Sequence, residues 1–340
     1  MINTKVKVGI VGATGLVGQE MLQILSELDL EKKFEAVLFA SSDRPSENIF
    51  DLNSNIPKLQ ECVFILNAAT NSIAEFLSAQ MKQHQCLIDN SSHFRMDPAV
   101  PLVVPEINGA LLESEPAIVA NPNCTAILLC LTLFPFLKPG FSRVIVSTYQ
   151  AASGAGIKGL EELESQLLAQ ATKQSIPKPQ VFPHVLAGNV ISHNTAIRES
   201  GRPGQGYNEE EWKVVEESRK ILNILHLSVS ASCMRVPVMR AHTETVTVDL
   251  KEELSLDEIR DRFVKAQGLS VVDNSDLQHF PMPLEASGKN LVLVGRIRKD
   301  STLAKTFHYM LAGDQLRKGA ALNAVQIMLE MQRLREIQEN

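Results

Sequence analysis

The sequence has no excess of basic residues, few cysteines and no long apolar run. It contains 33 Lys and Arg against 39 Asp and Glu, a formal net charge of −6. This balance argues against a nucleic-acid-binding protein, which usually carries a basic face. The five cysteines are odd in number and include no CxxC pair, so neither a disulfide framework nor a zinc site is indicated.

The sequence also shows no membrane or export segment. The longest apolar run, residues 124–137, contains Pro135 and is too short to cross a bilayer. The N-terminus passes directly into a strand pattern and lacks the features of a signal peptide. We therefore expect a soluble cytoplasmic protein with reduced thiols, with no membrane or nucleic-acid partner and no bound metal. Hydrophobic residues make up 44% of the 340 residues, which suffices for the cores of about two domains.

Strand and helix patterns alternate over the first 120 residues. Strands are expected at 6–11, 36–40, 62–67, 86–89 and 117–120, and helices at 16–28 and 73–82. This alternation predicts right-handed βαβ units with a parallel sheet, as in a dinucleotide-binding domain.

The pattern changes after residue 121. Helices are expected at 125–136, 160–172, 209–225 and 318–333, and strands at 143–149, 243–250 and 291–298. Strands grouped in this way predict a second, α+β domain with a mixed or antiparallel sheet.

Four glycines, Gly9, Gly12, Gly15 and Gly18, are spaced by threes where the first strand turns into the first helix. Glycines at such a turn let the backbone approach a pyrophosphate, which the N–H groups of the helix N-terminus attract. A purely structural turn is the alternative. Because the pattern follows a strand and opens a helix, it predicts dinucleotide binding.

The end of the second expected strand bears on the type of cofactor. Ser42 and Arg44 offer a hydroxyl and a guanidinium suited to the 2′-phosphate of NADP. Asp43 lies between them, and an ordinary polar turn is the alternative interpretation.

Cys124 differs from the other cysteines because it comes immediately before an apolar helix. A helix N-terminus stabilises a thiolate and lowers the pKa of the thiol. The other four are expected to be structural: Cys62 within a strand, Cys86 and Cys233 at strand starts, and Cys130 inside the helix.

At this segment the chain resembles the aspartate-semialdehyde dehydrogenases. The resemblance rests on GATGLVG, IVANPNCTA and STYQAASGAG, and on longer blocks at 89–108, 233–248 and 294–326. It implies reversible reductive dephosphorylation of aspartyl-4-phosphate to aspartate semialdehyde by NADPH, through a cysteine thioester, in the biosynthesis of lysine, threonine and methionine. It also implies a Rossmann-type domain, residues 1–123, completed by the C-terminal helix at 316–340. The resemblance further implies a catalytic and dimerisation domain at residues 124–315. It also implies that the protein forms a homodimer or homotetramer.

The resemblance assigns roles residue by residue. Cys124 matches the nucleophile, His242 the acid/base and Gln150 the amide that orients the reactants, while Asn123 lies beside the nucleophile as a donor to the oxyanion. Four further residues match substrate contacts: Arg235 for the α-carboxylate, Glu210 for the amino group, and Lys213 with Arg95 for the phosphate. A solvated acidic helix start is the alternative for the run that contains Glu210 and Lys213. The implied cofactor contacts are Thr14, Gly15, Leu16, Val17, Ser153, Gly154 and Gln315.

Three segments depart from the family pattern, and all three concern the cofactor. Residues 45–48 replace a common Ser-Ala-Gly-Lys, residues 67–72 lack the usual glycines, and Gln315 replaces a common Asn. Two alternatives therefore stay open: a related acyl-phosphate reductase, and a non-catalytic paralogue that serves as a binding protein.

Overall fold

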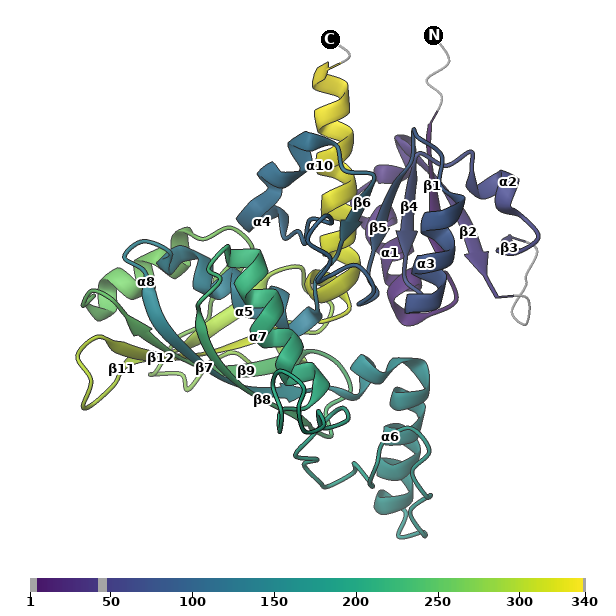
Figure 1. Ribbon diagram of the computed structural model, residues 1–340. Helices are drawn as coiled ribbons and strands as arrows, with labels where there is room; N and C mark the ends of the chain where they lie inside the picture. The colour runs from purple at the N-terminus through teal and green to yellow at the C-terminus, as the bar shows by residue number, and fades with distance from the viewer. Residues whose placement is uncertain (1–4, 42–47, 339–340) are drawn as a thin grey trace. The chain divides into compact units, whose positions relative to one another are not determined.

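The computed structural model describes residues 5–41 and 48–338 (Figure 1). The backbone forms two compact units, one within Met1–Asn123 and Gly319–Asn340 and the other spanning Cys124–Lys318. Within the described residues each unit contains one six-stranded sheet. None of the helices in these ranges has the length and apolar character needed to span a bilayer.

The first unit has a parallel sheet in the order β3-β2-β1-β4-β5-β6. Its strands are β1 (Val6–Val11), β2 (Phe34–Ala40), β3 (Ile49–Asp51), β4 (Phe64–Asn67), β5 (Cys86–Asp89) and β6 (Ile118–Ala120). Strand β1 pairs with β2 on one side and with β4 on the other. The strand order reverses at this point, and ligands of such sheets bind beyond the carboxyl ends of the strands there.

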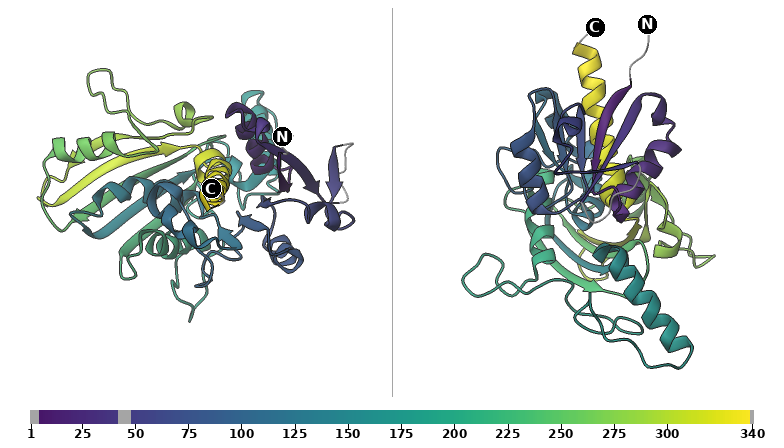
Figure 2. Two further views of the ribbon diagram at one scale, coloured as in Figure 1. Left: turned by 90° about the horizontal axis from the view of Figure 1, so that it is seen from above. Right: turned by 90° about the vertical axis from the view of Figure 1, so that its right-hand side faces the viewer.

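Helices cover both faces of this sheet because its strands bury side chains on both sides. On one face, Ile10 packs with α1 (Leu16–Glu27) and with the C-terminal helix α10 (Leu322–Gln338). On the other face, Ile65 packs with α3 (Asn71–Gln80). Figure 2 shows α10, in yellow, beside the purple N-terminal segments. The two ends of the chain therefore share one core.

The second unit has a mixed sheet in the order β10-β11-β12-β9-β7-β8. Its strands are β7 (Phe141–Gln150), β8 (Ser228–Arg235), β9 (His242–Leu250), β10 (Leu269–Val271), β11 (Val292–Lys299) and β12 (Thr306–Gly313). Strand β8 is parallel to β7 and β10 to β11, whereas the other neighbours are antiparallel. Three helices lie along one face (Figure 1): α5 (Cys124–Leu133), α7 (Glu209–Leu222) and α8 (Leu256–Lys265).

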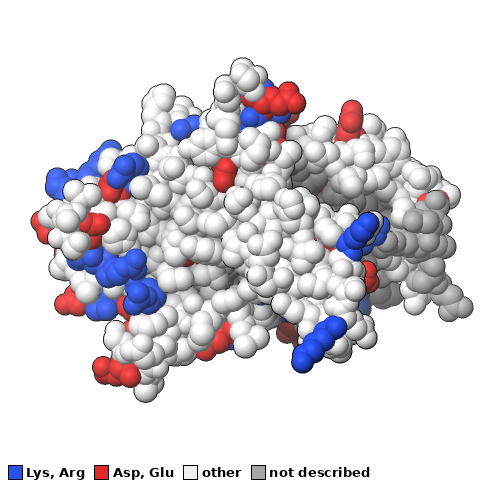
Figure 3. Space-filling view, turned by 90° about the horizontal axis from the view of Figure 1, so that it is seen from below, with Lys and Arg blue, Asp and Glu red and all other residues white. Residues whose placement is uncertain are grey.

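The opposite face of this sheet is open in the single chain. Exposed positions alternate with buried ones along β8, so that Ser228, Ser230 and Ser232 face outward. In the space-filling view of Figure 3, few Lys, Arg, Asp or Glu side chains appear in the middle of the view.

The fold class expected from the sequence is confirmed, with differences in detail. The helix expected from residue 160 is α6 (Gly156–Ala171) and begins earlier. Cys62 precedes β4 instead of lying within a strand, and Cys233 lies near the end of β8 instead of at a strand start. The small side chains of β8 carry little β-propensity; this segment becomes a strand because it pairs with β7 along its whole length.

Candidate active site

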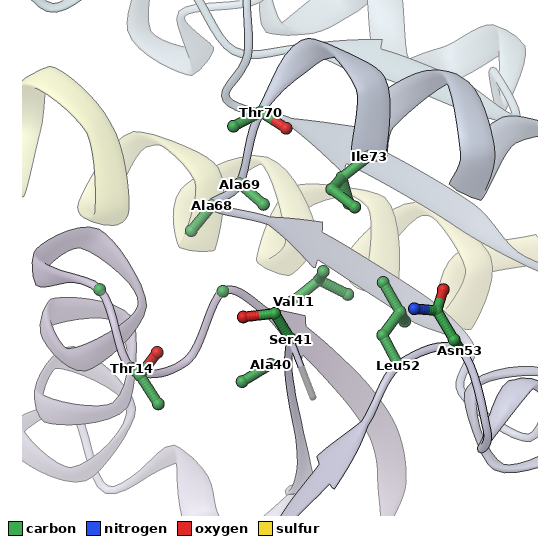
Figure 4. A pocket seen from close by; sticks show the side chains of 12 residues that line it. Val11, Thr14, Ala40, Ser41, Leu52, Asn53, Ala68, Ala69, Thr70 and Ile73 are labelled. Atoms are coloured by element: carbon green, nitrogen blue, oxygen red, sulfur yellow. The ribbon is translucent and has the colours of Figure 1, made fainter. Parts of the chain in front are cut away.

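A cavity of about 410 Å³ opens in the first unit where β1, β2 and β4 end (Figure 4). Ala40, Leu52 and Ile73 give it apolar walls, while Thr14 and Ser41 add hydroxyl groups. An apolar slot with a few polar groups suits a flat base and its sugar. The cavity lies at the strand crevice expected for a dinucleotide.

The glycine loop lines this cavity and could not be built from larger residues. Gly12 has a φ of +83°, and a Cβ there would lie 2.9 Å from the carbonyl oxygen of Ala68. A Cβ on Gly18 would lie 2.4 Å from the carbonyl oxygen of Gly12. Gly15 caps α1 without a side-chain hydrogen bond, which leaves the N–H groups of the first turn for an anion.

The other residues of the first unit that are predicted to contact the cofactor lie in three places. Leu16 and Val17 form the first turn of α1, where their N–H groups have no helical acceptor. Gly9 lies further back in β1, against Leu59 and Cys62. Ser42 and Arg44, the predicted 2′-phosphate contacts, lie outside the described residues.

Cys124 is the first residue of α5 and is only partly buried, whereas the other four cysteines are fully buried. Burial raises the pKa of Cys62 and of Cys86 to about 12. It raises the pKa of Cys130 and of Cys233 still further. A thiol with a raised pKa is a poor nucleophile at neutral pH. Exposure and position therefore set Cys124 apart within the chain.

Gln150, the last residue of β7, connects the helices that carry Cys124 and Glu210. Its amide Nε2 donates to Thr125 Oγ1 and to Glu210 Oε1, both at 3.1 Å. Thr125 follows Cys124 in α5, and Glu210 lies in the first turn of α7. Lys213 Nζ lies 3.6 Å from Glu210 Oε2. These contacts connect Gln150, Glu210 and Lys213 within the second unit, and they reach Cys124 through its neighbour Thr125.

Arg235 and His242 are buried together against the backbone of Ala151. Arg235 Nη1 donates to the Ala151 carbonyl oxygen, and the Ala151 N–H donates to His242 Nδ1 at 3.1 Å. A Cβ on Gly154 would lie 3.0 Å from Arg235 Nη1 and 3.5 Å from His242 Nε2, so a glycine allows this approach. Arg235 Nε and His242 Nε2 are buried, and neither has a hydrogen-bond partner in the part of the chain that the structure describes.

The charges of this pair depend on its burial. Burial, together with the nearby Arg235 cation, holds the pKa of His242 well below its usual 6.5. The ring is therefore neutral at pH 7, and its hydrogen lies on Nε2 because Nδ1 accepts from Ala151. Burial also lowers the pKa of Arg235, although Glu210 opposes that shift.

Ser153 and Gln315 lie on the same side of this unit as His242. The Gln315 amide donates to Ser153 Oγ and accepts from the Ala241 N–H at 2.9 Å. Ala241 has a left-handed φ of 72°, which strains a residue with a side chain. The Gln315 side chain therefore braces the backbone next to His242.

Arg95 and Asn123 belong to the first unit and are buried there. Arg95 donates from Nε to the Asn121 carbonyl oxygen at 3.0 Å and from Nη2 to that of Asn90 at 2.7 Å. These contacts fix the guanidinium beside the segment that leads into Cys124.

Two residues of the second unit that were not expected from the sequence lie close to the site or are deeply buried. Asn194 donates to Gln150 Oε1. Glu244, in β9, is fully buried, and neither of its carboxyl oxygens is hydrogen-bonded to another described residue. An isolated Asn in a loop and a Glu within a strand are common features, so neither pattern marks a site.

Glu244 gives a prediction about stability. Burial raises its pKa well above the usual 4.5, so the folded chain holds a proton that the unfolded chain releases. The stabilisation from that proton is complete below pH 4.5 and is lost as the pH rises towards the folded pKa. Relative to Glu244→Gln, the wild-type free energy of unfolding should fall above pH 4.5 by up to about 1.4 kcal/mol per pH unit.

Urea unfolding of both proteins from pH 4 to pH 8 measures this difference. Glu252→Gln, at an exposed position, is the control and should follow the wild type. Parallel curves for the wild type and Glu244→Gln would show that Glu244 is ionised in the folded protein.

Comparison with known proteins identifies the family. The NAD-binding domain of the semialdehyde dehydrogenases matches residues 7–114, and their dimerisation domain matches 133–318. The chain is 37% identical to the aspartate-semialdehyde dehydrogenase of Prochlorococcus marinus, over 94% of this chain and 93% of that protein. The chain belongs to the aspartate-semialdehyde dehydrogenase family. This membership confirms the resemblance, and with it an oxidoreductase of amino-acid biosynthesis that uses a nicotinamide dinucleotide.

A solved structure of the family agrees with this fold. The aspartate semialdehyde dehydrogenase II of Vibrio cholerae, complexed with ASA, has a TM-score of 0.87 and is 31% identical. The match covers 97% of this chain and 99% of that one. A second relative, from Synechocystis, is 38% identical over 95% of this chain and 96% of its own length.

Proposed function

We propose that this chain catalyses the reversible conversion of aspartyl-4-phosphate and NADPH to aspartate semialdehyde, phosphate and NADP through a thioester on Cys124. The observation that carries the proposal is the position of Cys124 at the start of α5. Gln150 there links the residue after Cys124 to Glu210. Arg235 and His242 lie in the same unit, joined through Ala151.

Cys124 is the nucleophile in this reaction. Its thiolate attacks the acyl carbon, a C–S bond forms, and the bond to the phosphate oxygen breaks so that phosphate leaves with the electron pair. A dinucleotide held by the glycine loop would supply the hydride that reduces the thioester carbon. The C–S bond then breaks, which releases the aldehyde and restores the thiolate. His242 donates from Nε2 to the oxygen on which charge develops, and Asn123 is proposed as a second donor.

The substrate is held by charges on both sides of the reacting carbon. The Arg235 guanidinium suits the α-carboxylate, because its buried Nε has no hydrogen-bond partner among the described residues. Glu210 faces the α-ammonium group, and Lys213 with Arg95 binds the phosphate. Local cations let an acidic protein bind an anionic substrate.

The glycine loop and the cavity beside it fit a dinucleotide. Gly12, Thr14, Gly15, Leu16 and Val17 would hold the pyrophosphate. On the nicotinamide side we assign Ser153 and Gly154, with Gln315 behind Ser153. The first unit is thus the cofactor domain, and the second is the catalytic and dimerisation domain.

We also propose that the chain assembles into a homodimer or homotetramer. The dimerisation-domain match covers the second unit, and the open face of its sheet carries outward-facing serines instead of charges along β8. Light scattering at micromolar concentration tests the assembly, and a monomer there would overturn it. The five unpaired cysteines suit a reducing cytoplasm, which a thiolate mechanism requires.

One assay tests the function. Purified protein receives aspartate semialdehyde and NADP or NAD, with or without phosphate, and the absorbance of the reduced nicotinamide is followed. A phosphate-dependent rise supports the proposal. No signal with either cofactor would leave a non-catalytic binding protein, and a signal restricted to another aldehyde would leave a related acyl-phosphate reductase.

Arg44 determines the cofactor preference in this proposal. Replacing it with alanine should raise the KM for NADP by about 10-fold or more, because a hydrogen bond to a charged phosphate is lost. The KM for NAD, which has no 2′-phosphate, should change little. Steady-state kinetics with both cofactors measure the effect, with Arg333→Ala, an exposed side chain of α10, as a control. Equal effects on NADP and NAD would exclude the assigned role.

A further inference from the structure

A short segment, residues 191–195, touches three of the site residues. Ile191 exchanges two backbone hydrogen bonds with Arg235, both 2.9 Å long. Thr195 Oγ1 accepts from the Glu210 N–H at 3.0 Å and contacts the N-cap of α7, Asn208, at 3.3 Å. Between these fixed ends, Asn194 Nδ2 donates to Gln150 Oε1. The segment is therefore held at both ends, and Asn194 within it holds Gln150.

The directions of these hydrogen bonds follow from one carboxylate. Glu210 accepts but cannot donate when ionised, so Gln150 must turn its Nε2 towards it. The Gln150 oxygen then accepts a hydrogen bond from Thr148 Oγ1 at 3.3 Å and faces Asn194, so Asn194 must present its own Nδ2. Asn194 Oδ1 is consequently left buried without a hydrogen-bond partner within residues 5–41 and 48–338. A buried amide normally satisfies both of its ends, so the needs of Gln150 set the orientation of Asn194.

We propose that Asn194 is a positioning residue that fixes the Gln150 amide with Nε2 towards Thr125 and Glu210. This inference rests on the proposed function, since Gln150 acts there beside the nucleophile. Asn194 itself does not contact the reacting atoms. A residue of this kind changes the rate by moving another group, and small displacements of such groups cost up to about 100-fold in rate.

Asn194→Asp separates positioning from simple packing because the two side chains have the same shape. Above neutral pH the new carboxylate cannot donate, so Gln150 turns and Glu210 loses its donor. At low pH the protonated carboxyl group donates to Gln150 Oε1 again. The titratable and charged groups around it are unchanged: Cys124 on α5, Glu210 and Lys213 on α7, Cys233 and Arg235 on β8, and His242 on β9. The ratio of variant to wild type at each pH therefore isolates the new group.

The experiment measures kcat and KM of the wild type, N194D and N194A from pH 5.5 to pH 8.5. We expect kcat for N194D about 10- to 100-fold below wild type at pH 8.5, and a ratio that rises as the pH falls. The KM for NADP should not change. N194A should lose activity at every pH. N189D is the control, since Asn189 is exposed in the same loop and bonds only to nearby backbone.

Two results would overturn the inference: a pH-independent N194D ratio, or N194A with wild-type kcat. If the wild type turns over no aspartate semialdehyde, the proposed function fails instead. Crystals of N194D at pH 8.5 then decide the orientation. Gln150 turned away from Glu210 would support the positioning role, and an unchanged amide would exclude it.

Discussion

Replacing Cys124 with alanine should lower turnover by about 10⁴-fold or more, because the covalent route is lost with its nucleophile. The remaining residues still bind substrate and dinucleotide, so the variant should retain ligand-induced thermal stabilisation. Stopped-flow and steady-state absorbance of the reduced nicotinamide measure the rate, and mass spectrometry detects the acyl-enzyme that only the wild type forms.

The matched control lies in the same helix. Cys130 is fully buried, and burial raises the pKa of its thiol, so Cys130→Ala should keep turnover within about threefold of wild type. Brief treatment of the native protein with iodoacetamide should modify Cys124 and spare the four buried thiols. Near-wild-type turnover by Cys124→Ala would show that the nucleophile is another group.

The sequence predicted the first unit well because its signals are local. A strand, a glycine turn and a helix follow one another between Val6 and Glu27, and a Cβ on Gly18 would collide with the nearby backbone of Gly12 and Ala13. Cys124 was also visible locally, at the start of an apolar helix.

The polar network of the second unit was not visible in the same way. Gln150, Asn194 and Glu210 come from three separated segments, and their contacts depend on the pairing of β8 with β7. The sequence pattern placed the start of β8 at Cys233, close to where the strand ends, so it offered no reason to place Asn194 beside Gln150. Family resemblance pointed to Gln150 and Glu210 singly, whereas the direction of each hydrogen bond needed the folded arrangement.

Gln315, which replaces the Asn common in the family, makes hydrogen bonds that support the backbone beside His242. Its longer amide reaches both Ser153 Oγ and the N–H of the strained Ala241. A left-handed conformation costs a residue with a side chain about 1 kcal/mol, and a buried hydrogen bond offsets a similar amount. The substitution thus supports the turn that presents His242.

His242→Ala should lower kcat by about 10²- to 10³-fold, the usual cost of removing one donor to a developing oxyanion. The Ala151 N–H holds Nδ1 as an acceptor, so the neutral ring offers a hydrogen only from Nε2. His242→Gln retains an N–H donor and should recover part of the lost rate. His279→Ala, at a surface pair with Glu285, is the control and should be silent.

The pH profile distinguishes this donor role from proton shuttling. Burial, with the Arg235 cation, keeps the pKa of His242 well below 6.5, so the neutral form should persist and wild-type kcat should not fall through His242 protonation between pH 8 and pH 6.5. A group that must gain and lose a proton would instead give a limb near its pKa. A wild-type limb near pH 6.5 that disappears in His242→Gln, with no recovery of rate, would contradict the donor role and make His242 a general acid and base.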